Sequence, residues 1–141
     1  NLPFHDDKML VGPETLLLID DDPHILMALQ RLFRQDGYRI LTAQSAAAGF
    51  ELLALNEVQV VMCDQRMPVM SGAVFFDKIK ELYPHIIRII LSGYTDLDSV
   101  IDSINHGDIY RFYTKPWDNV VLRDNLRQAF HHYWQLHESA R

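Results

Sequence analysis

Acidic side chains follow two apolar runs of the sequence at the points where each run ends. Asp20 and Asp21 come after the run Thr15–Ile19, and Asp64 follows the run Val58–Cys63. Carboxylates that lie close together repel one another and raise each other's pKa. A hard divalent cation such as Mg²⁺ relieves that repulsion, because it prefers carboxylate oxygens as ligands. If the two runs are strands of one sheet, the sequence predicts a magnesium site formed by these acids.

Two further groups suited to phosphate chemistry also follow apolar runs, namely Ser92 and Lys115. A hydroxyl and an amine can each bind a phosphoryl oxygen, and Gly93 beside the hydroxyl leaves space for one. With Asp64 as the nucleophile, and with Asp21 and Asp64 holding Mg²⁺, this set predicts phosphoryl transfer to a carboxylate. Each residue alone has an ordinary explanation as a cap or loop residue. The prediction depends on their occurring together, each at the end of a different strand.

The elements that would position these residues alternate along the chain. Apolar runs near residues 15–20, 38–43, 58–63, 86–91 and 109–114 are separated by amphipathic stretches, which is typical of repeated β-α units. The runs are nearly unbroken, and this favours a parallel sheet covered on both faces. The sequence therefore predicts an α/β fold, a three-layer doubly wound (βα)5 sandwich.

Capping residues predict where the helices begin and end. The first helix has Asp22 as its N-cap, Pro23 at its first position and Gly37 as its stop. The later N-caps are expected at Ser45, Ser71 and Asp96, and helix ends are expected at Pro84 and Gly107. The apolar face of the first helix is expected to consist of Ile25, Leu29, Leu32 and Phe33.

The last helix is predicted to begin near residues 118–119, and no stop signal precedes Arg141. Apolar residues recur along it in a nearly heptad pattern, at Leu122, Leu126, Ala129, Tyr133 and Leu136. Up to Phe130 a sheet-facing stripe explains the pattern. Beyond it, Tyr133, Trp134 and Leu136 would need a second copy or a downstream domain, or would form a free overhang. The expected organisation is a leader outside the fold (1–14), one domain (15–130) and a helix extension (131–141).

Composition narrows the class of protein. A chain of 141 residues is one ordinary domain, and its formal charge of −6 disfavours a nucleic-acid surface. Cys63 is the only cysteine of the sequence, so an intrachain disulfide or a cysteine zinc cluster is excluded. No apolar stretch reaches the roughly 18 residues of a membrane span. These features predict a cytoplasmic protein that binds neither nucleic acid nor membrane.

Four segments together resemble the receiver domain of bacterial two-component response regulators, the CheY-like family. They are Leu18-Ile-Asp-Asp-Asp-Pro23, Met62-Cys-Asp-Gln-Arg-Met-Pro-Val-Met-Ser-Gly72, Ile90-Leu-Ser-Gly-Tyr94 and Phe112-Tyr-Thr-Lys-Pro-Trp117. The resemblance covers residues 15–130 and implies the flavodoxin-like strand order 2-1-3-4-5. It also implies a signalling domain that catalyses only its own phosphorylation and dephosphorylation.

The resemblance implies a role for each site residue. Asp64 would accept a phosphoryl group from a sensor histidine kinase or a phosphotransfer protein. Mg²⁺ (or Mn²⁺) would be held by Asp20, Asp21, Asp64 and the backbone carbonyl of Arg66. Ser92 and Lys115 would bind phosphoryl oxygens.

The resemblance also implies a switch. Ser92 would move toward the new phosphoryl group, and Phe112 would rotate into the space it leaves. That movement would repack the face formed by the fourth helix, the fifth strand and the fifth helix. Arg66 and Tyr94 are larger than many family members have at these positions, and we expect them to shield the aspartyl phosphate from water. The signal would pass to a C-terminal output domain absent from this sequence, or to a homodimer formed through the last helix.

Three alternatives compete with this interpretation. A phosphatase of the haloacid-dehalogenase type would need a second Asp two residues after the nucleophile, where this chain has Arg66. A flavodoxin-like cofactor binder would need a hydroxyl-rich or glycine-rich loop after the first strand, where the chain has Asp20, Asp21 and Asp22. A degenerate receiver that is not phosphorylated is disfavoured, because every acceptor, metal and switch position is filled.

Overall fold

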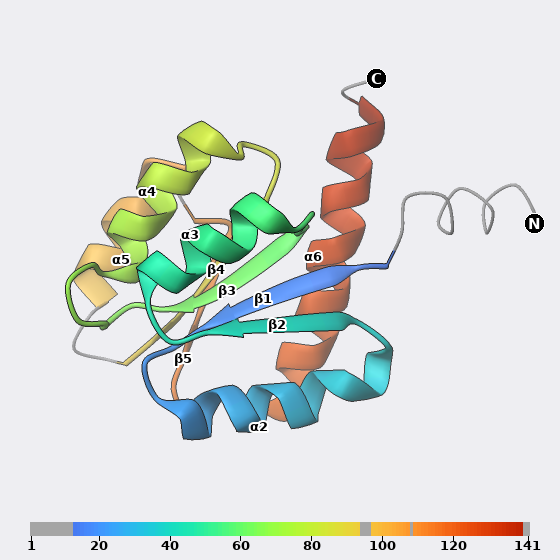
Figure 1. Ribbon diagram of the computed structural model, residues 1–141, viewed down its shortest axis with the longest axis horizontal. Coiled ribbons are helices and arrows are strands. Elements are labelled where there is room, and N and C mark those ends of the chain that lie inside the picture. Colours follow the sequence, from blue (N-terminus) through green and yellow to red (C-terminus); the bar gives the residue numbers. More distant parts are fainter. Residues whose placement is uncertain (1–12, 94–96, 108, 140–141) are drawn as a thin grey trace, which may run out of the picture.

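A computed structural model of the chain describes residues 13–93, 97–107 and 109–139. It contains one five-stranded parallel sheet with the order β2-β1-β3-β4-β5, shown in Figure 1. The strands are β1 (Thr15–Ile19), β2 (Arg39–Ala43), β3 (Val60–Asp64), β4 (Ile87–Ser92) and β5 (Arg111–Thr114). The order reverses between β1 and β3, which is the switch point at which such sheets bind ligands. This confirms the predicted doubly wound fold.

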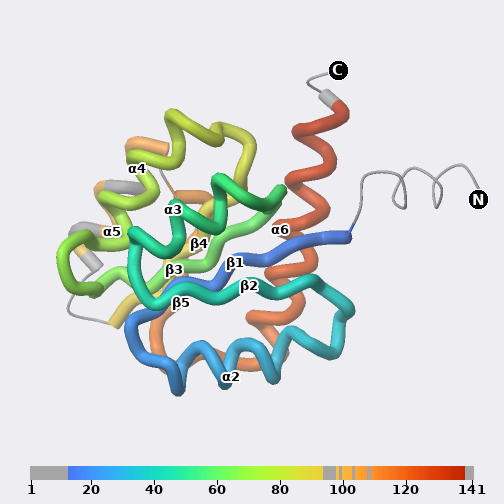
Figure 2. The backbone as a smooth tube through the Cα atoms, in the orientation of Figure 1, coloured from blue at the N-terminus to red at the C-terminus, as the bar shows by residue number. Residues whose placement is uncertain are grey.

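Helices cover both faces of the sheet. They are α2 (Pro23–Phe33), the short 3₁₀ helix η1 (Arg34–Asp36), α3 (Ala46–Leu55), α4 (Gly72–Leu82), α5 (Leu97–Asn105) and α6 (Asn119–Ser139). Figures 1 and 2 show α2 and α6 against one face and α3, α4 and α5 against the other. Successive strand residues point to opposite faces. In β1, Leu16 and Leu18 therefore join the core under α2 and α6, whereas Leu17 and Ile19 join the core under α3, α4 and α5.

Local capping explains the helix starts that the sequence predicted. The side chain of Asp22 accepts a hydrogen bond from the His24 N–H, with Pro23 at the first position of α2. The Ser45 and Ser71 hydroxyls accept from the N–H groups of Ala48 and Val74, respectively. Asp96, the expected cap of α5, lies outside the described residues. The backbone of the two predicted helix stops, Gly37 (φ 80°) and Gly107 (φ 78°), is left-handed, a conformation that only glycine adopts without steric cost.

The apolar face of the first helix and the bounds of the third strand differ in detail from the sequence predictions. Leu26, rather than Ile25, is fully buried on α2 beside Leu29, Leu32 and Phe33, whereas Ile25 is half-buried at the edge of that core. The third strand begins and ends later in the sequence than predicted (58–63), at Val60 and at Asp64 itself. Val58 is buried there without being part of the ladder, so burial without strand pairing explains the early predicted start.

Both ends of α6 contact the rest of the domain. Near its start, Arg123 donates to both carboxylate oxygens of Asp36 at 2.9 and 3.1 Å, which ties this end of α6 to η1. The indole N–H of Trp134 donates to Glu14 Oε2 at 2.9 Å, and Tyr133 packs against the core beneath α2 and α6. Glu14, which was expected to belong to the leader, is therefore joined to the fold. Leu136 remains exposed.

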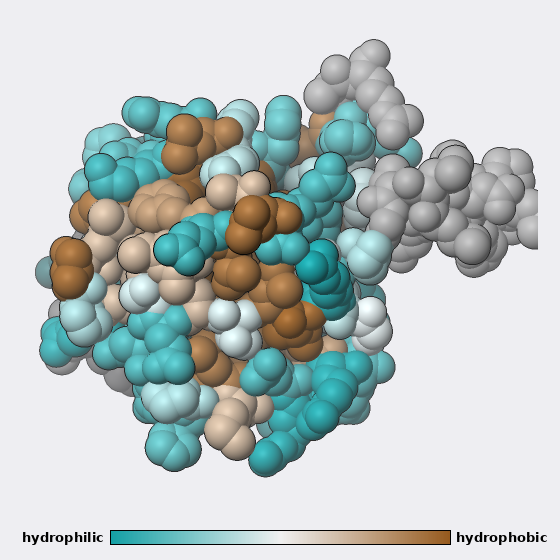
Figure 3. Space-filling model, viewed as in Figure 1, coloured by the Kyte–Doolittle hydropathy of each residue, from teal (hydrophilic) through white to brown (hydrophobic). Residues whose placement is uncertain are grey.

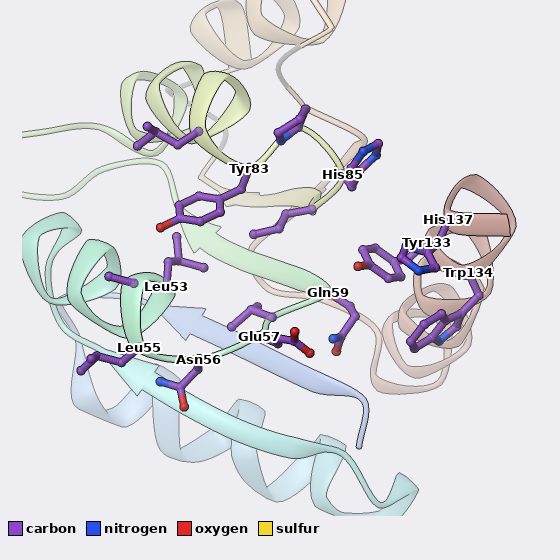
Figure 4. A pocket seen from close by; sticks show the side chains of 15 residues that line it. Leu53, Leu55, Asn56, Glu57, Gln59, Tyr83, His85, Tyr133, Trp134 and His137 are labelled. Carbon is purple, nitrogen blue, oxygen red and sulfur yellow. The ribbon is translucent and has the colours of Figure 1, made fainter. Parts of the chain in front are cut away.

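A groove lies at the amino edge of the sheet and has a volume of about 820 Å³. Figure 4 shows Leu53 and Leu55 of α3 on one side, Tyr133 and His137 of α6 on the other, and Gln59 at the base. Apolar residues also gather on the surface around α3 and the neighbouring edge strand, as the brown areas of Figure 3 show. None of the described helices is long and apolar enough to cross a membrane.

Candidate functional site

The predicted site residues converge at the carboxyl edge of the sheet. Asp20 follows β1, Asp64 ends β3, and Lys115 follows β5. Lys115 Nζ donates to Asp64 Oδ1 at 2.8 Å and to Asp20 Oδ2 at 3.0 Å. The sequence separations behind these two contacts are 51 and 95 residues. The parallel sheet thus brings together groups that are far apart in the chain.

Charge is concentrated in this site and shielded from water. Asp20 is 2% exposed and Asp64 is 7% exposed. Burial raises the pKa of Asp64; the hydrogen bond from Lys115 opposes that change, and the neighbouring charge of Asp20 adds to it. Burial alone would lower the pKa of Lys115, but its hydrogen bonds to Asp64 and Asp20 raise it overall. The ammonium group is thereby held charged between two carboxylates.

Three carboxylates are close enough to hold a metal ion. Oxygen atoms of Asp20, Asp21 and Asp64 lie within 4.8 Å of one another, with Asp21 exposed and the other two buried. The second oxygen of Asp20 accepts from the Asp22 N–H at 2.9 Å, which fixes its orientation. An all-oxygen set with one face open to solvent suits Mg²⁺, which keeps several of its waters when bound. Asp22 itself caps α2, as predicted.

Ser92 and Phe112 lie where the sequence placed them. Ser92 ends β4, is fully buried, and donates its hydroxyl hydrogen to Gly93 O at 3.0 Å. The backbone N–H of Lys115 donates to Ser92 O at 3.0 Å, so the two residues are joined side by side. The Lys115–Pro116 bond is cis. Phe112 is half-buried and packs into the core on the side of α5.

The loop between β3 and α4 holds features that sequence reasoning missed. Gln65 is 6% exposed, and its side-chain Oε1 accepts from the Ala73 N–H at 2.9 Å. A methyl group on Gly72 would lie 2.5 Å from the backbone oxygen of Asp64, so only glycine fits there. Val69 has a φ of 72° and a fully exposed side chain, an uncommon backbone state for a β-branched residue. The available sequence signal for Gln65 was a polar residue directly after Asp64 at the end of an apolar run.

Of the two residues expected to shield the site, only Arg66 belongs to the part of the chain that the structure describes. Arg66 is exposed in the loop, two residues after Asp64. Tyr94 lies outside the described residues. Cys63 is fully buried beside Asp64, and burial raises the pKa of its thiol well above the ordinary value. The Cys63 side chain is therefore part of the core under α3, α4 and α5.

Comparison with known proteins agrees with this geometry. Residues 16–127 match the model of the response regulator receiver domain family. The chain is 40% identical over 115 residues to the hydrogenase transcriptional regulatory protein HoxA of Cupriavidus necator, covering 82% of this chain and 24% of that protein. It is 35% identical over 117 residues to the transcriptional regulatory protein GlrR of Escherichia coli, covering 83% and 26%. The chain thus spans about a quarter of these relatives.

Solved structures show the same fold. The signal receiver domain of an HD domain-containing protein from Pseudomonas fluorescens superposes with a TM-score of 0.85 and 36% identity, covering 89% of this chain and 93% of that one. An uncharacterised protein from Neptuniibacter caesariensis gives 0.87 and 36%, covering 91% and 95%. The family match, the strand order and the acid–lysine cluster agree, and the chain belongs to the receiver domains of response regulators, the phospho-accepting modules of two-component signalling.

Proposed function

We propose that Asp64 is the residue of this receiver domain that accepts the phosphoryl group. The observation that carries the proposal is the position of the Lys115 ammonium, within 2.8 Å of Asp64 and 3.0 Å of Asp20. A cation at this point can bind an oxygen of a phosphoryl group attached to Asp64. Asp20 shares the contact with the amine, but its other oxygen already accepts from the Asp22 N–H and its side chain is 2% exposed. Asp21 is exposed.

The reaction transfers a phosphoryl group between a nitrogen and an oxygen. A carboxylate oxygen of Asp64 forms a bond to phosphorus while the bond from phosphorus to the donor's imidazole nitrogen breaks, and the electron pair of that bond leaves with the imidazole. A bound Mg²⁺, held by Asp20, Asp21, Asp64 and the Arg66 carbonyl, would neutralise charge on the group in transit. Lys115 and Ser92 then bind its oxygens.

The buried hydroxyl of Ser92 supplies the switch. Its hydrogen is now donated to Gly93 O, so it must turn to donate to a phosphoryl oxygen on Asp64. Phe112, which packs on the side of α5, then moves into the vacated space. The movement repacks the face made by α5, β5 and α6, and thereby biases whatever that face contacts.

The partners follow from the family and from the last helix. A sensor histidine kinase or a phosphotransfer protein supplies the phosphoryl group. HoxA and GlrR are transcriptional regulatory proteins about four times as long as the matched region, and we propose that this receiver likewise controls an output domain. Tyr133 and Trp134 have contacts within the chain. A homodimer through α6 would therefore use the exposed apolar residues of that helix, Val120, Val121 and Leu136.

Arg66 and Tyr94 set the lifetime of the aspartyl phosphate in this proposal, because both would flank the path of an attacking water. The double variant Arg66→Asn with Tyr94→Ala is expected to shorten the half-life of the phosphorylated protein. The half-life is measured by intact mass after removal of the donor. An unchanged half-life would remove both residues from this role.

The acceptor itself is tested with acetyl phosphate and Mg²⁺, followed by intact mass measurement. The wild type is expected to gain the mass of one phosphoryl group, and Asp64→Ala is expected to gain none. Asp22→Asn is the matched control, because Asn still caps α2 and the site acids remain. Phosphorylation that persists in Asp64→Ala, or that is missing in the wild type, would refute the assignment.

A further inference from the structure

Gln65 occupies an unusual place for a polar side chain. It directly follows the acceptor strand and is only 6% exposed. A buried amide must be hydrogen-bonded, since an unpaired one costs free energy on folding. The geometry here goes beyond that requirement, because the bonds of Gln65 join three separate elements.

Gln65 ties the end of β3 to β4 and to the first turn of α4. Its backbone N–H donates to Leu91 O at 3.1 Å, and its backbone oxygen accepts from the Gly72 N–H at 2.9 Å. Its side-chain Oε1 accepts from the Ala73 N–H, also at 2.9 Å. Gly72 and Ala73 lie in the first turn of α4. Their N–H groups have no acceptor within the helix, because the first four N–H groups of any helix lack one.

The hydroxyl of Ser71 caps the next donor of the same turn, the Val74 N–H, at 3.2 Å. Gln65 and Ser71 thus divide the cap between them. They differ in their other bonds: Gln65, the residue after Asp64, is also bonded to β4 through its backbone N–H, whereas the Ser71 side chain bonds within its own helix start. The two residues are therefore a natural pair for separating a capping role from a role in the site.

These bonds close the loop 66–71 at both of its ends. Gly72 lies directly against the Asp64 backbone oxygen, so a shift of α4 moves the acceptor's own backbone. Arg66, whose carbonyl is assigned to the cation under the proposed function, is the first residue of the closed loop. From this juxtaposition we infer that Gln65 is a positioning residue, whose side chain holds the loop in the form that binds the divalent cation.

The inference rests on the proposed function for its cation site, but it is measured without phosphorylation. Isothermal titration with MgCl₂ compares the wild type with Gln65→Met, which has a similar length and no amide oxygen, and with Ser71→Ala. Removing groups that orient metal ligands typically weakens binding about 10–100-fold. We expect Gln65→Met to raise the Kd for Mg²⁺ by about tenfold and Ser71→Ala to leave it unchanged, although both remove one cap from α4.

Equal Mg²⁺ affinities in Gln65→Met and the wild type would overturn the inference and leave the proposed function intact. Equal losses in Gln65→Met and Ser71→Ala would reduce Gln65 to a helix cap. A wild type that binds no Mg²⁺, or an Asp64→Asn variant that binds it as tightly as the wild type, would refute the cation site on which both proposals stand.

A reciprocal measurement needs no variant. If the bond from Ala73 to Gln65 favours cation binding, cation binding must favour that bond by the same factor. Saturating Mg²⁺ is therefore expected to slow hydrogen exchange of the Ala73 amide in the wild type. The Ala48 amide, which is capped in the same way by Ser45 at the start of α3, is the matched control and should not change. Unaltered exchange at Ala73 would overturn the inference even if Gln65→Met failed to fold.

Discussion

At the amino edge of the sheet, Thr15 and Gln59 form two hydrogen bonds with each other. At the carboxyl edge, the carboxylates of Asp20, Asp21 and Asp64 lie close together. The Thr15 N–H donates to Gln59 Oε1 at 2.7 Å, and the Gln59 N–H donates back to Thr15 O at 3.2 Å. Both residues are neutral and buried. The acids at the other edge carry like charges, and their repulsion is offset by the Lys115 ammonium.

The difference separates residues that stabilise the fold from residues that do chemistry. Paired neutral groups lower the free energy of the folded chain, because no donor is left without an acceptor. Clustered acids raise the free energy of the folded chain, because their charges repel. Such a cluster is found where a bound cation or a reaction requires the acids. Removal of a polar group should therefore have opposite effects on stability at the two edges.

The largest effect is expected at the amino edge. Gln59→Leu leaves the Thr15 N–H buried without its acceptor, and should lower the free energy of unfolding by about 1–3 kcal/mol. Urea denaturation measures the change. Thr15→Val is the control, because the backbone bonds to Gln59 remain, and it should have a much smaller effect. Equal stabilities of Gln59→Leu and the wild type would show that this edge is not held by the pair.

Mg²⁺ should stabilise the domain through the carboxyl edge alone. Binding to the folded state adds RT ln(1 + [L]/Kd), which is about 1.4 kcal/mol at ten times the Kd. The Tm measured by calorimetry should therefore rise with MgCl₂ beyond the rise given by NaCl of equal ionic strength. Gln59→Leu should keep the increment and Asp64→Asn should lose most of it. The same increment in Asp64→Asn would place the cation elsewhere.

Asp64→Asn should make the protein more stable at neutral pH when Mg²⁺ is absent. Burial raises the pKa of Asp64 in the folded state, so the folded protein binds that proton more tightly than the unfolded chain, whose Asp pKa is about 3.9. Wild-type stability then falls as the pH rises through the folded pKa, and Asn avoids this loss.

Asp64→Asn is expected to be more stable than the wild type at pH 7, because Lys115 keeps Asp20 as its partner and is not left as an uncompensated charge. Urea titrations between pH 3 and 8 should show the two proteins converging below about pH 4, where Asp64 is protonated in both states. A variant less stable than the wild type at pH 7 would mean that the ion pair with Lys115 outweighs the cost of burial.

The positions of the site acids could be predicted from the sequence, but the contacts of the residues that hold them in place could not. Asp20 and Asp64 were predictable, because strand runs and caps are local patterns and parallel strands bring their carboxyl ends to one edge. The role of Gln65 was not predictable, because its bond to Ala73 depends on where α4 settles after the loop. The exclusion of a side chain at Gly72 likewise depends on how closely α4 approaches β3.

The last helix shows the same limit over a longer distance. The pattern up to Phe130 predicted a sheet-facing stripe, and Leu122, Leu126 and Ala129 are indeed buried. For Trp134 the sequence offered a partner outside the chain or none. The structure pairs it with Glu14, 120 residues away, and no local pattern encodes a contact of that range.

That contact gives the smallest expected effect and tests whether the amino edge includes the helix extension. Trp134→Phe removes the indole N–H, and a hydrogen bond at a half-exposed site contributes about 0.5–1 kcal/mol. The loss of stability should be local: amide hydrogen exchange should become faster in residues 131–138 of α6 and change little near Leu122. Glu14→Gln is the control, because its amide oxygen can still accept from Trp134. If exchange in Trp134→Phe is unchanged, α6 is held by the packing of Tyr133 and the paired amino edge ends at Gln59.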